Sequence, residues 1–244
     1  MLQDRLSLGK APEGARRHGT RDDGACVVFD LDGTLADTSA DLLAAANACF
    51  TEMGEGAPLT SADSLTAFHG GRAMLRLGFG RLGREVPEDA AMERLYPELL
   101  RHYRAAIAVQ TRMYPGAVET VEALRMAGYK VSVCTNKPFA LAEELLRQLG
   151  VRDLFGALVG ADTLPVRKPD PAPYHLAVEQ AGGVVARSLL IGDTETDLRT
   201  SRAVGVPSVL VTFGPEGAGI ARLAPDALLD RYEDLPGIVA RLIG

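Results

Sequence analysis

Cysteine, lysine and long apolar runs are all scarce in this sequence, and the scarcity of cysteine pairs and of long apolar runs excludes whole classes of protein. The three cysteines, Cys26, Cys49 and Cys134, form no Cys-x-x-Cys pair and lie inside apolar runs, so we expect buried free thiols in a reducing cytosol. No apolar stretch approaches the length of a membrane-spanning helix, and residues 1–23 are polar, without the apolar segment of a secretory signal. The sequence therefore predicts a cytoplasmic protein without a membrane partner, preceded by a flexible tail at residues 1–23.

Positive charge is also in short supply. Lysine and arginine together number 26 against 32 acidic residues, which gives a net charge of −6. A general nucleic-acid binder usually carries a basic patch, so we expect no nucleic-acid partner. The lysines are Lys10, Lys130, Lys137 and Lys168, and their scarcity makes the position of each one easier to interpret.

The chain of 244 residues can bury a substantial core, either in one large domain or in one domain with a sizeable insert. Short apolar runs that do not alternate with polar residues are typical of strands buried on both faces of a parallel sheet. Helical patterns of the length of a βαβ crossover lie between such runs, so the sequence predicts an α/β fold with a doubly wound parallel sheet. The predicted strands are residues 26–29, 131–134, 157–159, 189–191 and 209–211, and the predicted helices are residues 117–127, 139–149, 174–181 and 196–204.

Residues 38–110 break this alternation. They contain no convincing strand run, and the segments 40–53, 62–77 and 88–109 have helical patterns with Gly and Pro between them. We therefore expect a helical insert at 38–110 between the two parts of an α/β core, residues 24–37 and 111–244.

Polar clusters follow four of the predicted strands. In open α/β sheets, ligands bind outside the carboxyl ends of the strands, so we expect these clusters to converge in one crevice. They are Asp30-Leu31-Asp32-Gly33-Thr34-Leu35, Thr135-Asn136-Lys137, Lys168-Pro169-Asp170-Pro171 and Gly192-Asp193-Thr194-Glu195-Thr196-Asp197.

The residue types in these clusters suit phosphoryl transfer. Several carboxylates close together repel one another unless a cation lies among them, and oxygen ligands favour a hard ion such as Mg²⁺. A hydroxyl, an amide and a lysine supply donors for phosphate oxygens, and a helix that begins after Asn136 adds the positive end of its dipole. Each cluster alone has a simpler interpretation, such as a polar turn, a helix cap or a solvated loop lysine. Their occurrence in this order, each after a strand, favours a phosphoryl-transfer site.

These clusters resemble the four motifs of the haloacid dehalogenase-like hydrolase superfamily, and in detail its phosphoglycolate phosphatase-like branch. The resemblance covers about residues 24–240 and leaves residues 1–23 outside it. The stretches that carry it are 30–38, from Tyr114-Pro115-Gly116 through Thr135-Asn136-Lys137-Pro138, from Gly160 through Lys168-Pro169-Asp170-Pro171-Ala172-Pro173, and from Gly192-Asp193 to Asp197.

The resemblance implies a role for each matching residue. Asp30 would be the nucleophile that forms an aspartyl-phosphate, and Asp32 would be the general acid and base. Thr135 and Lys168 would bind the transferring phosphoryl group, assisted by Asn136. The implied Mg²⁺ ligands are Asp30, the backbone carbonyl of Asp32 and Asp193, with Asp197 either a direct ligand or a residue that supports the ligands. The insert at 38–110 would be a cap that closes over the site.

Two features depart from the motifs or add to them. Glu195 places an extra carboxylate near the implied metal, where it either faces solvent or takes a metal role. In the insert, the segment Phe68-His69-Gly70-Gly71-Arg72 lies where such caps present a substrate loop. His69 and Arg72 would then meet a substrate carboxylate, and the alternative is a surface loop with incidental charge.

The sequence also separates this chain from other members of the superfamily. Related dehalogenases lack the second aspartate, which is present here as Asp32. Related phosphonate hydrolases need a lysine in the cap, and residues 38–110 contain none. Phosphoglucomutase-like relatives have a cap histidine where this chain has Leu42. We therefore expect a phosphatase that acts on a small phosphorylated metabolite, with phosphoglycolate as the favoured substrate. We expect the protein to be a monomer or a homodimer. Nucleotidase or pyrophosphatase activity and a non-catalytic binding module stay open as alternatives.

Overall fold

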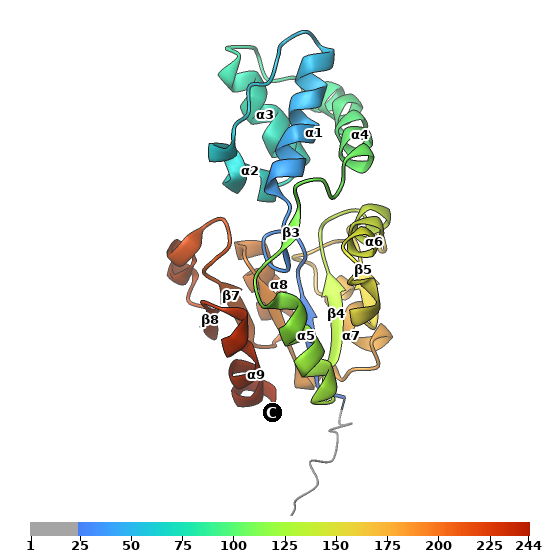
Figure 1. Cartoon of the computed structure of the whole chain (residues 1–244), viewed down its shortest axis with the longest axis vertical. Coiled ribbons are helices and arrows are strands. Elements are labelled where there is room, and N and C mark those ends of the chain that lie inside the picture. Colours follow the sequence, from blue (N-terminus) through green and yellow to red (C-terminus); the bar gives the residue numbers. More distant parts are fainter. Residues whose placement is uncertain (1–23) are drawn as a thin grey trace, which may run out of the picture.

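The computed structural model describes residues 24–244, so the tail expected at residues 1–23 lies outside the described residues. A layered α/β core forms one end of the molecule, and the helices α1 to α4 form the other end (Figure 1). In residues 24–244, no helix is both long and apolar enough to cross a membrane.

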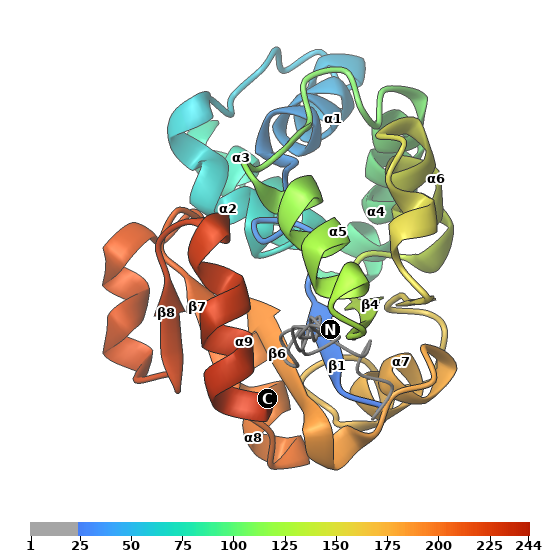
Figure 2. The same ribbon diagram turned by 60° about the horizontal axis from the view of Figure 1, so that its bottom comes forward.

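The core contains a six-stranded sheet in which every pair of neighbouring strands is parallel. Its strand order is β5-β4-β1-β6-β7-β8, so the first strand lies near the centre, between β4 and β6 (Figure 2). The five predicted strands are present within one residue at each end, whereas β8 was missed. The strands are β1 (Cys26–Phe29), β4 (Lys130–Cys134), β5 (Ala157–Val159), β6 (Ser188–Gly192), β7 (Ser208–Val211) and β8 (Ala227–Leu229).

Helices cover both faces of this sheet, as expected for a doubly wound fold. Successive side chains of a strand point to opposite faces, so Val27 and Phe29 join the apolar cluster of α5, α6 and α9. Cys26 and Val28 join the cluster of α7, on the face where α7 also contacts α8. The helices are α5 (Ala117–Met126), α6 (Phe139–Gln148), α7 (Ala172–Gln180), α8 (Glu195–Val204) and α9 (Leu235–Ile243), of which α9 was not predicted.

The insert is helical, as expected, but the single helix predicted at 62–77 is wrong. A short 3-10 turn (Ser61–Asp63) leads into two helices, which are separated at His69 and Gly70. Gly70 has a φ of 98°, which interrupts the helix and which other residues rarely adopt. A Cβ on Gly71 would lie 2.9 Å from the Tyr96 ring, so the absence of a side chain at Gly71 lets α3 approach α4. The helices are α1 (Ser39–Glu52), α2 (Ser64–Phe68), α3 (Gly71–Arg81) and α4 (Asp89–Ala105).

The two chain crossings between core and insert lie side by side. They form a small antiparallel ribbon from β2 (Ala36–Asp37) and β3 (Arg112–Met113). The buried carboxylate of Asp41, in the first turn of α1, accepts hydrogen bonds from Gln110 N at 3.0 Å, from Thr111 N at 2.8 Å and from Thr111 Oγ1 at 2.8 Å. This carboxylate therefore ties the start of the insert to its end.

We predict that Asp41→Ala lowers the free energy of unfolding by about 2–4 kcal/mol, because it leaves several buried donors without a partner. Equilibrium denaturant unfolding measures the change. The control is Glu122→Ala, an exposed acid on α5, which should change stability by no more than about 0.5 kcal/mol. A loss for Asp41→Ala as small as that of the control would contradict the role given to this carboxylate.

Candidate active site

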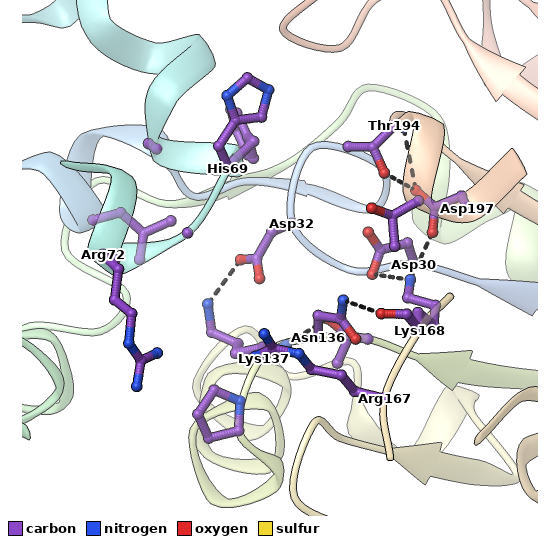
Figure 3. Close-up of a pocket in the computed structure, with 18 of the residues that line it drawn as sticks. Asp30, Asp32, His69, Arg72, Asn136, Lys137, Arg167, Lys168, Thr194 and Asp197 are labelled. Carbon is purple, nitrogen blue, oxygen red and sulfur yellow. Dashed lines mark hydrogen bonds and ion pairs between the residues drawn. The ribbon is translucent and has the colours of Figure 1, made fainter. Parts of the chain in front are cut away.

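The four polar clusters meet at the carboxyl edge of the sheet, as the sequence predicts. Asp30 directly follows β1, Thr135 follows β4 and Asp193 follows β6, while Lys168 lies on the loop after β5. The parallel arrangement brings all of these strand ends to the same edge. Figure 3 shows Asp30, Lys168 and Asp197 in contact, with Asp32 and Lys137 beside them toward the helical insert.

Three buried carboxylates form the centre of this arrangement. Asp30, Asp193 and Asp197 each offer an oxygen, and these oxygens all lie within 4.8 Å of one another. Asp30 Oδ1 and Asp193 Oδ2 are buried and have no hydrogen-bond partner within the described part of the chain. Buried carboxylate oxygens without partners are costly, so this pair of oxygens has the character of a cation site.

Lys168 supplies the positive charge that the described chain places among these carboxylates. Its Nζ lies 2.6 Å from Asp197 Oδ1 and 3.0 Å from Asp30 Oδ1, the latter as an ion pair without hydrogen-bond alignment. Burial by itself lowers the pKa of Lys168, but Asp197 and Asp30 outweigh that effect and raise it, so the ammonium stays charged. One positive charge therefore faces three carboxylates.

The Asp197 carboxylate is fully engaged by the protein. Its Oδ1 accepts from Lys168, and its Oδ2 accepts from Thr194 Oγ1 at 2.6 Å and from Thr194 N at 3.2 Å. The contacts with Thr194 form a capping box that starts α8. Asp197 thus orients Lys168 and the helix, and the buried oxygens without a hydrogen bond are those of Asp30 and Asp193.

Burial and mutual repulsion act strongly on these two aspartates. Burial raises the pKa of Asp30 to about 6, with Lys168 opposing the rise and the Asp197 and Asp32 carboxylates adding to it. Burial, followed by the charges of Asp30 and Asp197, raises the pKa of Asp193 well above its usual value. A dication between two carboxylates removes this repulsion, and the all-oxygen donor set suits Mg²⁺ rather than a metal that prefers nitrogen or sulfur.

Gly33 allows the first cluster to approach Asp193. It has a φ of 81°, and a Cβ built on it would lie 2.3 Å from Asp193 Oδ2. The next residue, Thr34, donates a hydrogen bond of 3.0 Å from Oγ1 to Asp193 Oδ1. The glycine therefore leaves room for Asp193 Oδ2, while Thr34 fixes the other oxygen.

The side chain of Asp32 is directed away from the carboxylate cluster (Figure 3). Its Oδ1 accepts from Lys137 Nζ at 2.8 Å and from Thr38 Oγ1 at 2.7 Å. The buried Lys137 ammonium also lies 4.4 Å from the centroid of the Tyr103 ring, which belongs to α4. Burial alone lowers the pKa of Lys137, but Asp32 and Tyr103 outweigh it and raise the pKa, so Lys137 stays charged.

Sequence reasoning quoted Lys137 within its motif but gave it no role. The available signal was the rarity of lysine in this chain together with its position directly after Thr135 and Asn136. Its partner Asp32 lies 105 residues earlier, so no local pattern could identify the pair.

The remaining phosphate-binding candidates lie beside Lys168. Thr135 is buried, and its Oγ1 accepts a hydrogen bond of 3.1 Å from Lys137 N. The Asn136 side chain donates 3.0 Å to the backbone carbonyl of Lys168. Asn136 thereby fixes the loop that carries Lys168, a role that the sequence did not predict.

The two cap candidates differ in their surroundings. Both His69 and Arg72 line the cleft between the helical insert and the core, and His69 is exposed. Arg72 donates from Nε and from a terminal nitrogen to the two carboxylate oxygens of Glu93, both at 2.7 Å, and its guanidinium stacks 3.8 Å from the centroid of the Tyr96 ring. The guanidinium fork of Arg72 is thus occupied within the insert, and substrate contact by His69 and Arg72 stays a prediction.

The cleft that contains these groups has a volume of about 820 Å³. Its lining includes residues that follow the core strands, the loop between α2 and α3, and one side of α4. Glu195 lines it as an exposed side chain, and its role at the metal stays a prediction. Such a volume is typical of small-molecule sites.

Comparisons with known proteins place the sequence among hydrolases. A family model described as haloacid dehalogenase-like hydrolase matches residues 25–205. A phosphoglycolate phosphatase of Agrobacterium fabrum (strain C58 / ATCC 33970) is 40% identical over 220 residues, which cover 89% of this chain and 93% of that protein. A phosphoglycolate phosphatase of Caulobacter vibrioides is 37% identical over 215 residues, which cover 87% and 90% of the two chains.

Solved structures share the fold over most of the chain. A protein described as a predicted phosphoglycolate phosphatase from Haemophilus somnus 129pt has a TM-score of 0.76 at 25% identity, and the match covers 90% of this chain and 99% of that one. A hydrolase from Pseudomonas syringae has a TM-score of 0.70 at 24% identity and covers 90% and 100%. These matches include the helical insert as well as the α/β core.

We predict that Mg²⁺ raises the melting temperature of the wild-type protein, because an ion bound only to the folded state adds about 2.7 kcal/mol at a hundredfold excess over its dissociation constant. In metal-free buffer, Asp193→Asn should be at least as stable as wild type, since it removes one of the crowded charges. Its melting temperature should no longer respond to Mg²⁺. Thermal unfolding with chelator and with added Mg²⁺ measures both effects.

The matched control for that measurement is Asp153→Asn, which makes the same change at an exposed position outside the cleft. It should keep the full response to Mg²⁺. If Asp193→Asn keeps that response as well, the cation does not bind between Asp30 and Asp193.

Proposed function

The chain is a phosphatase that belongs to the haloacid dehalogenase-like hydrolases, in the phosphoglycolate phosphatase-like branch, and we propose that it hydrolyses small phosphate monoesters by a Mg²⁺-dependent, covalent mechanism. The observation that carries this proposal is the pair of buried oxygens of Asp30 and Asp193 that accept no hydrogen bond from the described chain, beside the Lys168 ammonium. Bound between the two aspartates, Mg²⁺ would neutralise negative charge on the phosphoryl oxygens.

Asp30 is the proposed nucleophile. A carboxylate oxygen of Asp30 attacks phosphorus, the bond from phosphorus to the leaving oxygen breaks, and an aspartyl-phosphate forms. Lys168 and the hydroxyl of Thr135 hold the phosphoryl oxygens, and Asn136 keeps the Lys168 loop in place. Catalysis of this kind depends mainly on positioning and on electrostatic stabilisation of the transferring group.

Asp32 is the proposed general acid and base. Lys137 and Thr38 both donate to its Oδ1, which leaves Oδ2 to carry the proton. Oδ2 gives that proton to the leaving alcohol and then takes one from the water that hydrolyses the aspartyl-phosphate. After the second step, inorganic phosphate leaves and Asp30 is regenerated.

Residues 38–110 are the proposed cap, with residues 24–37 and 111–244 as the catalytic core. The four helices have their own apolar cluster, drawn from residues within 42–100. Two short crossings join them to the core, and the cleft lies between the two parts. A cap in this position excludes water from the reaction and admits the substrate when it opens.

Phosphoglycolate is the favoured substrate, because the relatives with the highest identities quoted above carry that name. Nucleotidase and pyrophosphatase activities are the alternatives within the family. The retained set Asp30, Asp32, Lys168 and Asp193 argues against a non-catalytic module. We also propose a cytoplasmic monomer or homodimer without a nucleic-acid partner, as its three buried thiols and net charge of −6 suggest.

We predict that Asp30→Asn abolishes phosphate release while the fold stays intact, because an amide of nearly the same shape cannot act as the nucleophile. The loss should reach several orders of magnitude, as when the nucleophile of other covalent enzymes is removed. Asp32→Asn should also be severely impaired, since the proton donor is gone. Phosphate release from a panel of phosphorylated metabolites, with circular dichroism as the test of folding, measures these effects.

The surface change Asp153→Asn serves again as the control and should leave the rates unchanged. A folded Asp30→Asn variant with near-normal turnover would remove covalent catalysis from the proposal. Full wild-type turnover in excess chelator would remove the metal requirement.

A further inference from the structure

The charged residues that line the cleft differ in whether a carboxylate already neutralises them. Within residues 24–244, five lysine and arginine side chains line it, and four of them form ion pairs with carboxylates. The pairs are Arg72 with Glu93, Lys137 with Asp32, Lys168 with Asp30 and Asp197, and Arg222 with Glu216. The fifth, Arg167, has no carboxylate partner among the described residues.

Arg167 has a fixed position relative to the proposed phosphate site. It directly precedes Lys168, whose carbonyl is held by Asn136 at 3.0 Å, and its own carbonyl accepts a hydrogen bond of 2.9 Å from Asp170 N. These two bonds anchor the backbone from which the side chain extends. Figure 3 shows the Arg167 side chain along the cleft on the side of Asn136 and Lys137.

The remaining charge in the cleft is unevenly distributed. Glu195, which directly follows Thr194, also lines the cleft and is exposed. In Figure 3, Thr194 lies on one side of Asp30 and Arg167 on the other. An anionic group on the substrate would be repelled near Glu195 and attracted near Arg167.

We propose that Arg167 determines substrate specificity by binding a carboxylate carried on the leaving-group part of the substrate. This proposal rests on the phosphatase mechanism given above. It adds a binding residue for the leaving-group part of the substrate, to which the mechanism assigns no contact. A guanidinium presents parallel donors that match the two oxygens of a carboxylate. No hydrogen bond or ion pair from residues 24–244 occupies the Arg167 guanidinium, whereas the fork of Arg72 is filled by Glu93.

The test compares 2-phosphoglycolate with ethyl phosphate, which has the same number of carbon atoms and no carboxylate. Arg167→Met should lower kcat/KM for phosphoglycolate by about ten- to a hundredfold, the range expected for loss of a charged hydrogen-bonded contact. Most of the change should lie in KM, and ethyl phosphate should change less than about threefold. Arg167→Lys keeps the charge but loses the fork, so it should lie between wild type and Arg167→Met.

The matched control is Arg125→Met, which removes the same charge from an exposed position on α5, outside the cleft. It should leave both substrates unchanged. Arg167 is itself exposed, so its replacement should not alter folding, and an unchanged melting temperature of Arg167→Met checks this.

Equal losses on both substrates, or no loss on either, would overturn the proposal while leaving the phosphatase mechanism intact. A selective loss in Arg72→Met, with Arg167→Met normal, would assign the carboxylate to the cap instead. A wild-type enzyme without turnover of any phosphate ester, nitrophenyl phosphate included, would overturn the proposed function itself and this proposal with it.

Discussion

Three carboxylates share one buried ammonium at the carboxyl edge of the sheet, and the rest of the site is arranged around this imbalance of charge. Asp197 accepts the hydrogen bond from Lys168 with one oxygen and a hydrogen bond from Thr194 with the other. Asp30 and Asp193 are left with an excess of negative charge, and each has one buried oxygen that accepts no hydrogen bond from the described chain. This geometry favours the binding of a dication. It also keeps the proposed nucleophile Asp30 next to the dication and to the Lys168 ammonium, which would together bind the phosphoryl oxygens.

The proposed general acid lies at the boundary between the two parts of the molecule. Lys137 comes from the core, yet it fills the space between Asp32 and the Tyr103 ring of the helical part. Tyr103 and Ile107 belong to the same apolar cluster as the core strands, so the end of α4 is packed as part of the core. The orientation of Asp32 therefore depends on residues from both parts, and a displacement of α4 would disturb the chemistry as well as the enclosure of the site.

Much of this arrangement follows from local sequence patterns. A buried strand can be recognised in the sequence as an apolar run. The parallel sheet then brings the residues that follow each run, such as Asp30 and Asp193, to the same edge. Local patterns do not predict the features that depend on contacts between residues far apart in the sequence. Gly70 interrupts a helical pattern through its positive φ, and the neighbouring Gly71 leaves room for Tyr96 of α4. The β8 strand was missed because its apolar run, Ala227–Leu229, is only three residues long, and short apolar runs also occur in helices and loops. The partners of Lys137 and Arg72 lie 105 and 21 residues away, beyond the reach of any periodicity.

The central position of β1 also sets the order in which the molecule can be completed during synthesis. Of the strands in the sheet, β1 is synthesised first, but the sheet neighbours of its first residue, Cys26, are Lys130 of β4 and Ser188 of β6. The helical part draws its apolar cluster from residues within 42–100, so it can collapse on the ribosome while β1 still waits for both of its neighbours. Pairings of such long sequence separation form late. Most of the helical part can therefore pack before the core sheet is complete, while Tyr103 and Ile107 still lack their core neighbours. A product truncated before β6 would also lack Asp193 and would be inactive.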